Sequence, residues 1–427
     1  MLPVIFKIPG LGWEIPGYGF ALMIGFLLSI FWAVRRATKS GGNPDVVIKC
    51  SFLAILGGVV GARFMYVVHY WDKFALRGSA LQVFLGILDV RKGGLEVYGG
   101  FICVVVLVFL YLRLGKHSIR WYLDILAPSA ALGHAITRIG CFLNGCCWGG
   151  VCAELPWAVR FPFGSPVEVQ QWQDRVPGAE LPQQLLAFGE RKVGSVLPLP
   201  REALRASDRA LDTVRARFEE ATRDLRGRLE QATDADERQG LREQMLAAAR
   251  RSIAPPGRGL EYAGELMSKY KLTGADLHRL AHEHPSLAVQ PTQLYTTVTL
   301  GLLALFLDAL YWRRTRDGQV ICALLLIEPW TRWVLETLRA DNPVDTLGVL
   351  TISQFLAICL SAAGLVGLLW LRKLPPRSAR AVLWAVPAAG GAGPSARRAD
   401  AKNGLGRRHG APDAGGRQGS RPKRLRK

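Results

Sequence analysis

Residues 97–113 read VYGGFICVVVLVFLYLR, an apolar run in which the only charged side chain is the final Arg113. A helix needs about 20 mostly apolar residues to cross the hydrocarbon core of a bilayer. Helices and closed barrels are the only structures that satisfy their backbone hydrogen bonds in that core. We therefore predict that this stretch is a transmembrane helix.

Six further apolar runs of similar length accompany it. They lie at about 17–35, 49–70, 121–142, 292–312, 318–338 and 347–371. The fourth and sixth spans along the chain are the least regular, because one carries Asp124 and Arg138 and the other carries Glu328 and Arg332. Together the runs predict an all-α polytopic membrane protein with seven transmembrane helices.

Positive charge is distributed unevenly between the loops. The basic clusters follow spans one, three, five and seven, whereas alternate loops such as 341–345 are not basic. The clusters are residues 35–39, 113–120, 313–316 and 372–373. Because cytoplasmic loops are enriched in Lys and Arg, the pattern predicts an N-terminus outside and a C-terminus in the cytoplasm.

The chain divides into four parts by composition. Residues 1–150 hold spans one to four, 151–290 an insertion with 20 acidic and 20 basic side chains, 291–372 the last three spans, and 373–427 a basic tail. Apolar residues at helical spacing over Arg201–Ile253 predict an amphipathic hairpin that breaks near 232–236. We expect the insertion to be mainly helical and extracytoplasmic, either as a charged decoration or as a domain that recruits a substrate or partner.

The tail contains 15 basic and 2 acidic residues from Arg372 onward, and few apolar side chains. Such a composition predicts disorder, because little apolar surface is available to offset the entropy lost on ordering. A cytoplasmic polybasic tail is attracted to anionic lipid headgroups. No folded element for reading nucleic acid accompanies it, so we predict membrane lipids and no nucleic acid as partners.

The eight cysteines fall into two groups. Those expected to pack in apolar spans as small hydrophobic side chains are Cys50, Cys103, Cys322 and Cys359. Those expected at the outer end of span four are Cys141, Cys146, Cys147 and Cys152. A disulfide among the last three is compatible with an oxidising compartment. The C-x4-C-C-x4-C spacing is not a strong zinc pattern and has no His pair, so no metal site is predicted.

Ionisable residues within membrane spans cost about 2.5–3.5 kcal/mol to insert at a helix centre, and they mark functional sites. Arg138 opens the segment RIGCFLNGCCWG at 138–149. Arg332, Glu336 and Arg339 are spaced by four and three residues, which predicts that they share one helix face. Because the planar fork of arginine suits a phosphodiester, these residues favour a phospholipid headgroup site, with a structural Arg–Glu network as the alternative.

Two glycine-rich stretches accompany these residues. One is GGLEVYGGF at 93–101, and the other comprises Gly140, Gly145, Gly149 and Gly150. Glycine lets the backbone approach a ligand closely. Small residues also allow helices to pack closely in lipid, so the sequence leaves both explanations open.

These segments, in this order, resemble the prolipoprotein diacylglyceryl transferase family. The family signature is close to G-R-x-G-N-F-x-N-x-E-x-x-G, and residues 137–149 match it. The other similar segments are 16–19, the glycine-rich 93–101, 290–295, and Arg332 with Glu336 and Arg339. The resemblance covers residues of about 12–162 and 288–372.

The resemblance implies a multi-pass enzyme of the bacterial inner membrane. Its reaction would transfer the diacylglyceryl group of phosphatidylglycerol to the lipobox cysteine thiol of a preprolipoprotein, forming a thioether and releasing glycerol-1-phosphate. It implies no cofactor, no metal and a monomer. Residues matching catalytic positions are Arg138, Tyr98 and Tyr18, and those matching headgroup-binding positions are Arg138, Arg332, Glu336, Arg339, Asn144, Gly149, Gly99 and Gly100.

Three positions depart from the family pattern. Tyr98 stands where well-studied members have a histidine proposed as the base, Cys141 replaces the first signature Asn, and Cys146 replaces the signature Glu. A phenol is a poor base at neutral pH unless nearby arginines stabilise the phenolate. Tyr98 would therefore either act as such a base or orient the headgroup while the arginine field acidifies the thiol. The cysteines would mark either an active branch or a paralogue, and retained activity is the favoured interpretation.

Two other functions compete with this one. A catalytically degenerate core could serve as a membrane scaffold or binding module, and a lipid transporter is the second alternative. No inverted repeat is evident between spans 1–3 and 5–7, which argues against a transporter. His134 is expected to be a packed or pore-lining histidine, with a substitute base as the alternative. Arg63 and Asp124 are expected to form an interhelical polar network, and Glu328 a structural acceptor.

Overall fold

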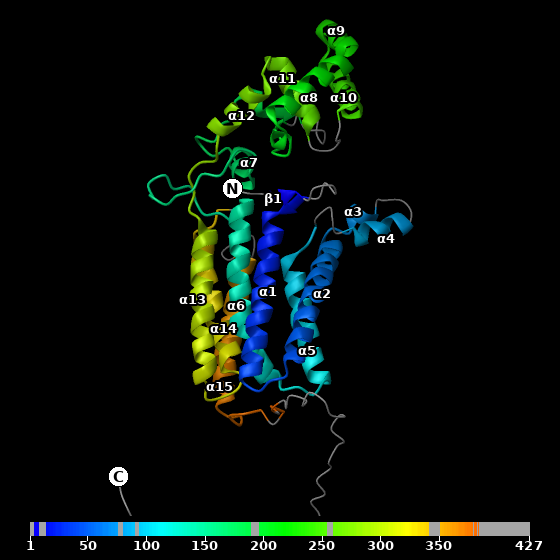
Figure 1. Cartoon of the computed structure of the whole chain (residues 1–427). Coiled ribbons are helices and arrows are strands. Elements are labelled where there is room, and N and C mark those ends of the chain that lie inside the picture. The colour runs from blue at the N-terminus through cyan, green and yellow to red at the C-terminus, as the bar shows by residue number, and fades with distance from the viewer. Residues whose placement is uncertain are drawn as a thin grey trace, which may run out of the picture. The chain divides into compact units, whose positions relative to one another are not determined.

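Seven long helices account for the apolar runs of the sequence (Figure 1). The structure is a computed structural model, and it describes residues 4–7, 14–75, 80–89, 94–188, 196–253, 259–340, 351–378, 380, 381 and 383. The long helices are α1 (Gly17–Lys39), α2 (Pro44–His69), α5 (Val97–Leu114), α6 (Ile119–Asn144), α13 (Thr292–Arg313), α14 (Gln319–Thr337) and α15 (Ile352–Leu371). Shorter elements near the N-terminal half are β1 (Val4–Lys7), β2 (Glu14–Pro16), α3 (Asp72–Ala75) and α4 (Ala80–Leu88).

Six of these helices, within the described part of the chain, are long and apolar enough to cross a membrane. They are α1, α2, α5, α6, α13 and residues 353–371 of α15. The helix α14 is not among them, and it carries Glu328, Arg332 and Glu336. The fold is thus that of a polytopic all-α membrane protein with six candidate spans, and a seventh crossing by α14 stays a prediction.

The bundle is built from close helix pairs. The helix α2 packs against α5, α1 against α6, α14 against α15, and α13 against α6. At the α2–α5 contact, a Cβ atom added at Gly99 would lie 2.5 Å from the Gly61 carbonyl oxygen, and one at Gly100 would lie 2.7 Å from that of Gly58. Only glycine permits backbones to approach so closely. Close helix packing therefore accounts for Gly99 and Gly100. It is one of the two explanations that the sequence left open, the other being close approach of the backbone to a ligand.

Two buried charged residues join helices through separate networks. Arg36 on α1 donates from Nε to Asp308 Oδ1 on α13 at 2.8 Å and from Nη1 to the Ile125 carbonyl at 2.7 Å. Asp124 on α6 accepts from the amides of Gly318 at 2.7 Å and of Val320 and Ile321 at 3.0 Å, at the start of α14. Asp124 thereby ties α6 to the first turn of α14, as the expected structural role requires.

Arg63 has a local structural role on α2. Its guanidinium donates to the carbonyls of Gly86, Ile87, Asp89 and Gly94 at 2.7–3.0 Å. These bonds hold the segment around α4 against α2, so Arg63 and Asp124 belong to different networks.

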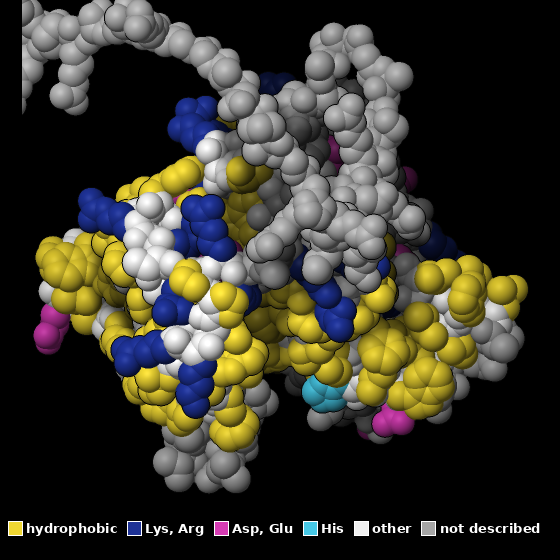
Figure 2. Space-filling model, turned by 90° about the horizontal axis from the view of Figure 1, so that it is seen from below, with side chains coloured by type: hydrophobic (Ala, Val, Ile, Leu, Met, Phe, Trp, Pro, Cys, Tyr) yellow, Lys and Arg dark blue, Asp and Glu magenta, His cyan; other side chains and the backbone are white. Residues whose placement is uncertain are grey.

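Basic side chains gather at the end of the bundle where α1, α5 and α13 finish (Figure 2). The last turns of these helices carry Lys39, Arg113 and Arg313. Disorder from residue 373 onward stays a prediction, while residues 374–378 make hydrogen bonds to the loop between α13 and α14. The Leu374 carbonyl accepts from Arg316, the Pro376 carbonyl accepts from the Asp317 amide at 2.8 Å, and the Ser378 amide donates to Asp317. Leu374 of this stretch is also partly buried.

The insertion leaves the bundle after α6 and returns at α13. Backbone bridges from Val151 and Val159 to Val289 join its two ends. Its elements are α7 (Pro166–Gln173), η2 (Gln183–Leu185), β3 (Leu186–Phe188), β4 (Val196–Pro198), η3 (Ala203–Arg205), α8 (Asp208–Ala221), α9 (Arg223–Gln231), α10 (Ala235–Ser252), α11 (Leu260–Tyr270) and α12 (Gly274–Glu283). The helical structure is interrupted between α9 and α10, where the sequence predicts a break. It is interrupted a second time at Thr222, between α8 and α9.

A hydrophobic cluster of its own stabilises the insertion. Leu211, Val214 and Phe218 of α8 are buried in it together with Leu246 of α10 and Met267 of α11. The heptad-like spacing of the α8 residues places them on one face of the helix. The apolar pattern read from the sequence is therefore the face that packs against the neighbouring helices.

The buried carboxyl group of Glu168 should make the free energy of unfolding of this insertion depend on pH. Its side chain is buried, and burial raises the pKa of this carboxyl from 4.5 to about 7, although the Gly164 amide donates to it at 2.9 Å. The folded state therefore holds a proton that the unfolded state loses above pH 4.5. Stability should fall as pH rises from about 4.5 to 7, by up to about 3 kcal/mol.

Glu168→Gln should remove this dependence, since the amide stays neutral and still accepts from Gly164. We expect the variant to melt at a higher temperature than the wild type at pH 8, and at the same temperature near pH 4. The exposed Glu283→Gln is the matched control, and it should leave the melting curve unchanged. Equal effects of Glu168→Gln at both pH values would contradict the prediction.

Three predicted features lie outside the described residues. They are the loop at 341–345, the basic tail from Trp384 onward, and the Pro255-Pro256-Gly257 segment, whose proline and glycine residues predict the end of the amphipathic hairpin.

Candidate functional site

A narrow cavity lies between α6, α13 and α14. It is lined by His134, Arg138, Cys147, Thr292, Thr296, Leu300, Glu328, Thr331, Arg332, Leu335, Glu336 and Arg339. The cavity has a volume of about 20 Å³. Such a space holds about one water molecule. The cavity brings together four of the predicted site residues, namely Arg138, Arg332, Glu336 and Arg339.

Arg138 is oriented by a residue of its own helix. Its Nε donates to His134 Nε2 at 3.3 Å, one turn earlier on α6. Because arginine carries no acceptor, the imidazole nitrogen must be the acceptor in this pair. His134 therefore positions the guanidinium, in addition to lining the cavity, and its Nε2 lone pair is occupied by that contact.

Arg332 connects to Tyr98 through a serine. Arg332 Nη2 donates to Ser353 Oγ at 3.2 Å, and the Tyr98 hydroxyl lies 3.0 Å from the same Oγ. These residues come from α14, α15 and α5. The phenol of Tyr98 thus reaches the arginine through the Ser353 hydroxyl, an arrangement that suits orientation of a side chain or ligand.

Glu336 and Arg339 form an ion pair at the edge of the cavity, with 3.6 Å between Oε2 and Nη1. The predicted common helix face is wrong for Arg339, because α14 ends at Thr337. Arg339 instead forms a backbone bridge with Gly149. A Cβ atom at Gly149 would lie 2.9 Å from the Leu338 carbonyl oxygen and 2.8 Å from the Gln290 Cβ, so glycine permits the bridge that holds Arg339.

The start of α13 holds the loop that follows α6. Thr292 Oγ1 donates to the Cys147 carbonyl at 2.8 Å, and Gln293 Nε2 donates to the Cys146 carbonyl at 2.8 Å. Both donors belong to the 290–295 segment that the sequence singled out. Their function in the fold is to place the second half of the signature segment against the cavity.

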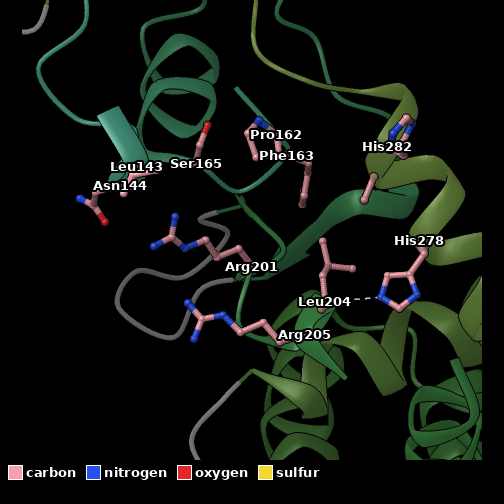
Figure 3. Close-up of a pocket in the computed structure, with 11 residues that line it drawn as sticks. Leu143, Asn144, Pro162, Phe163, Ser165, Arg201, Leu204, Arg205, His278 and His282 are labelled. Atoms are coloured by element: carbon pink, nitrogen blue, oxygen red, sulfur yellow. Dashed lines mark hydrogen bonds between the residues drawn. The ribbon is translucent and has the colours of Figure 1, made fainter. Parts of the chain in front are cut away.

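Six of the predicted site residues do not line this cavity, namely Tyr18, Tyr98, Gly99, Gly100, Asn144 and Gly149. Tyr18 is 39% exposed at the start of α1, where a Cβ atom added at Gly140 would lie 3.2 Å from the Tyr18 Cα atom. Asn144, the last residue of α6, lines a different cavity of about 280 Å³ (Figure 3).

That second cavity joins the end of α6 to the insertion. Its polar and charged lining residues are Asn144, Ser165, Arg201, Arg205, His278 and His282. Burial lowers the pKa of Arg201 from its usual value, while Glu202, 3.7 Å away, partly offsets this effect. His278 is held by the Leu204 carbonyl at 2.9 Å. Glu202 pairs with Arg201 and Arg205, and Asp208 pairs with His278. The cavity shares no lining residue with the arginine cavity.

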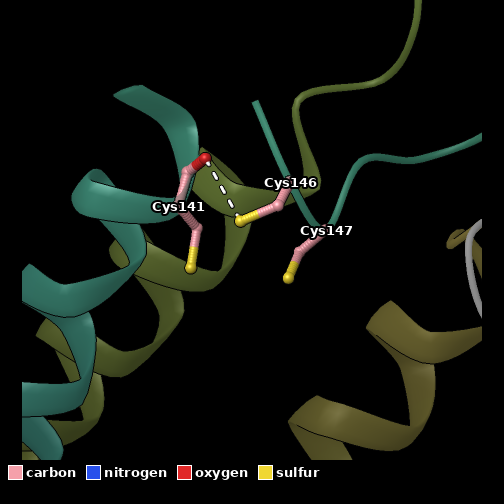
Figure 4. Close-up of side chains that lie close together, drawn as sticks. All are labelled: Cys141, Cys146 and Cys147. Carbon is pink, nitrogen blue, oxygen red and sulfur yellow. Dashed lines mark hydrogen bonds between the residues drawn. The ribbon is translucent and has the colours of Figure 1, made fainter. Parts of the chain in front are cut away.

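Three thiols come together beside the arginine cavity. The sulfur atoms of Cys141, Cys146 and Cys147 lie within 4.8 Å of one another (Figure 4), and all eight cysteines are free. The disulfide that the sequence allowed among Cys146, Cys147 and Cys152 is not formed. Cys152 is not part of the group, and Cys141 takes its place because the loop after α6 turns back toward the last turn of the helix.

Sequence reasoning missed some residues of the site. Glu328 was expected to be only a structural acceptor, yet it lines the cavity beside His134, for which a packed or pore-lining position was expected. The four-residue spacing of His134 and Arg138 on one helix was a usable signal. Ser353 offered no signal, because an isolated serine in an apolar span acquires its role only when α5, α14 and α15 meet.

The charges of the cavity define what it can do. Three arginines and two glutamates line this small cavity. Guanidinium groups converging from different elements bind phosphate oxygens through charge-assisted hydrogen bonds. The two carboxylates limit the net positive charge and can orient the arginines.

Comparison with known proteins agrees with this geometry. The family model described as prolipoprotein diacylglyceryl transferase matches residues 3–370. A phosphatidylglycerol--prolipoprotein diacylglyceryl transferase of Rhodopirellula baltica is 35% identical over 160 residues, which are 38% of this chain and 32% of the relative. Those of Pseudoalteromonas translucida and Clostridium tetani are 33% identical over 167 residues and 32% over 161 residues.

The matched segments cover only part of this chain and only part of each relative. They cover 39% and 38% of this chain, and 60% and 61% of the Pseudoalteromonas and Clostridium relatives. The family model, by contrast, extends over most of the sequence and includes every residue of the arginine cavity. The chain therefore belongs to the prolipoprotein diacylglyceryl transferase family.

Proposed function

We propose that this chain transfers the diacylglyceryl group of phosphatidylglycerol to the lipobox cysteine of preprolipoproteins. The observation that carries the proposal is the convergence of Arg138, Arg332 and Arg339 on one cavity. The relatives bear the name of this activity, and the signature segment supplies Arg138. We also propose that the enzyme is a monomer of the bacterial inner membrane, with lipobox peptides as its protein substrates.

The proposed reaction exchanges one bond for another. The substrate thiolate attacks the glyceryl carbon bound to phosphate, a carbon–sulfur bond forms, and the carbon–oxygen bond breaks. The electron pair leaves with the phosphate oxygen as glycerol-1-phosphate, and the thiol proton is lost to a base or to water. Because negative charge grows on the leaving phosphate, preorganised guanidinium groups stabilise the transition state.

The arginine cavity must widen before a phospholipid headgroup can bind in it. A volume of about 20 Å³ cannot contain a phosphoglycerol headgroup. Binding therefore requires that arginine side chains swing toward the phosphate and widen the space. The long, rotatable arginine side chains allow such movement, while His134 and Ser353 define the positions from which Arg138 and Arg332 start.

The proposed orientation places the N-terminus outside and the C-terminus in the cytoplasm, with α14 as a seventh crossing. Lys and Arg at the ends of α1, α5 and α13 support this orientation (Figure 2). The arginine cavity and the insertion would then lie on the outer side, where exported preprolipoproteins arrive.

The direct test is a transfer assay with the purified full-length chain. Phosphatidylglycerol labelled in its glyceryl moiety and a lipobox peptide are incubated with the enzyme in detergent. We expect a thioether-linked product, identified by mass spectrometry, that requires the peptide thiol. Absence of product from a folded protein supplied with phosphatidylglycerol would overturn the transferase and favour the scaffold alternative.

Tyr98→Phe separates the two roles considered for this phenol. If Tyr98 only orients Arg332 through Ser353, the loss of one hydrogen bond of about 1 kcal/mol should slow transfer roughly fivefold. A general base would instead account for a factor of about 10²–10⁴. The contacts favour the small effect, which initial rates in the transfer assay would measure.

Ser353→Ala provides the matched variant for this prediction, because it removes the bridge and leaves the phenol. We expect a similar loss from Ser353→Ala alone, and little further loss in the double variant. A large loss confined to Tyr98→Phe would show that the phenol takes part in proton transfer, and would contradict the orienting role.

A further inference from the structure

The thiols of Cys141, Cys146 and Cys147 form a group that the proposed transfer reaction does not use (Figure 4). Cys141 belongs to the last turn of α6, and the other two belong to the loop that follows. Among the described residues, these three side chains are the one group of three His, Cys, Asp or Glu residues close enough to share a metal ion. Cys141 is buried, and Cys146 and Cys147 are partly buried.

The backbone of the loop is arranged to bring the thiols together. Gly145 ends α6 in the left-handed conformation, with φ +76°, and its amide donates to the Cys141 carbonyl at 2.9 Å. Cys147 also has a positive φ of 62°. This conformation is uncommon for a residue other than glycine. The loop thus reverses direction tightly enough to return its thiols to the helix that it has just left.

The loop is also anchored from another helix. The carbonyls of Cys146 and Cys147 accept from Gln293 and Thr292 on α13, both at 2.8 Å. The Cys146 thiol itself lies 3.7 Å from the Cys141 carbonyl oxygen. Because the cysteine backbones are held in this way, the three sulfur atoms approach one another without a covalent link.

We propose that Cys141, Cys146 and Cys147 bind a thiophilic d10 cation, either Zn²⁺ or Cu⁺, through three thiolates. Thiolate ligands select such ions. A tetrahedral ion with metal–sulfur distances of about 2.3 Å places its sulfur ligands about 3.8 Å apart. The sulfur atoms already lie within 4.8 Å of one another, so ligation needs a contraction of no more than about 1 Å.

The surroundings suit such an ion. Cys147 lines the arginine cavity together with Arg138 and Arg339, so guanidinium charge lies near the negative charge of a trithiolate. Cys147 is the one of the three that lines this cavity, whose volume of about 20 Å³ has room for a water molecule that could serve as a fourth ligand of Zn²⁺. The isolated C-x4-C-C spacing predicted no metal, because the sequence does not show that the helix end and the loop converge.

Metal uptake by the full-length chain tests the proposal. The protein is purified in detergent with a reductant and a chelator, exposed to Zn²⁺ or to a Cu⁺ complex, and separated from free ions by gel filtration. We expect one ion per chain by elemental mass spectrometry. Titration with Cd²⁺ should also produce the ultraviolet charge-transfer absorption of thiolate–metal bonds.

Cys146→Ser and Cys147→Ser should each lose both the bound ion and the charge-transfer band. Cys152→Ser is the matched control, since it lies in the same loop region but outside the group, and it should keep both. Melting curves and gel-filtration profiles establish that each variant is folded. Comparison of the Zn²⁺ and Cu⁺ arms in competition with chelators of known affinity shows which ion is preferred.

Two results would overturn the proposal. One is a reduced, folded wild type that takes up no more ion than Cys146→Ser. The other is a disulfide between two of the three thiols that re-forms in the presence of either ion, which would make the group a redox pair. Neither readout depends on transferase activity, so the metal site and the proposed function can fail separately.

Discussion

Arg138→Ala should lower the rate of diacylglyceryl transfer by at least about 100-fold, because it removes a preorganised donor to the leaving phosphate. The guanidinium is held by His134 at 3.3 Å and faces the same cavity as Arg332 and Arg339. Arg138→Lys should recover only part of the loss, since lysine keeps the charge but not the planar fork of donors. Initial rates of labelled product formation measure both effects.

Arg120→Ala is the matched control, because Arg120 lies at the opposite end of the same helix and donates to the carbonyls of Asp317 and Pro375. It should leave the transfer rate unchanged. An Arg138→Ala protein that is folded and as active as the wild type would exclude the arginine cavity as the headgroup site.

Asp124→Ala should lower the free energy of unfolding by about 3–5 kcal/mol, the usual cost of removing one partner from a buried charged network. Three amides at the start of α14 would lose their acceptor, and Arg314, whose Nε lies 3.3 Å from Asp124, would keep only Asp317 as a counter-charge. Because α14 carries Arg332 and Glu336, activity should fall together with stability.

Thermal unfolding in detergent measures this effect, with Asp45→Ala as the control at an exposed carboxylate. Asp124→Asn should be intermediate, since the amide oxygen can still accept from the α14 amides but carries no charge. A melting temperature of Asp124→Ala equal to that of the wild type would contradict the proposed anchoring of α14.

The helices of the bundle were predictable because each long apolar run has one stable form in a membrane. The runs at 97–113 and 121–142 correspond to α5 and α6 with small differences at their ends. The hydrogen bonds of residues 374–378 were not predictable in the same way. Residues 374–378 are held by hydrogen bonds to Arg316 and Asp317, and composition does not report such contacts.

The site was predictable only in part. Arg138, Arg332, Glu336 and Arg339 were named from the sequence, and they line one cavity. Asn144 follows Arg138 by six residues in the signature segment, yet it lines the other cavity, because it ends the helix and points toward the insertion. Sequence proximity within a motif did not determine which cavity each side chain faces.

The sequence by itself determined the helical membrane fold, the family and the identity of the converging arginines, because hydropathy and motif residues are local properties of the chain. Only the tertiary structure decided that Gly99 and Gly100 permit the α2–α5 contact, that Ser353 connects Tyr98 to Arg332, and that three cysteines meet. Each of these contacts joins segments whose relative positions depend on how whole helices pack. Packing is a cooperative property, so no single stretch of sequence contains it.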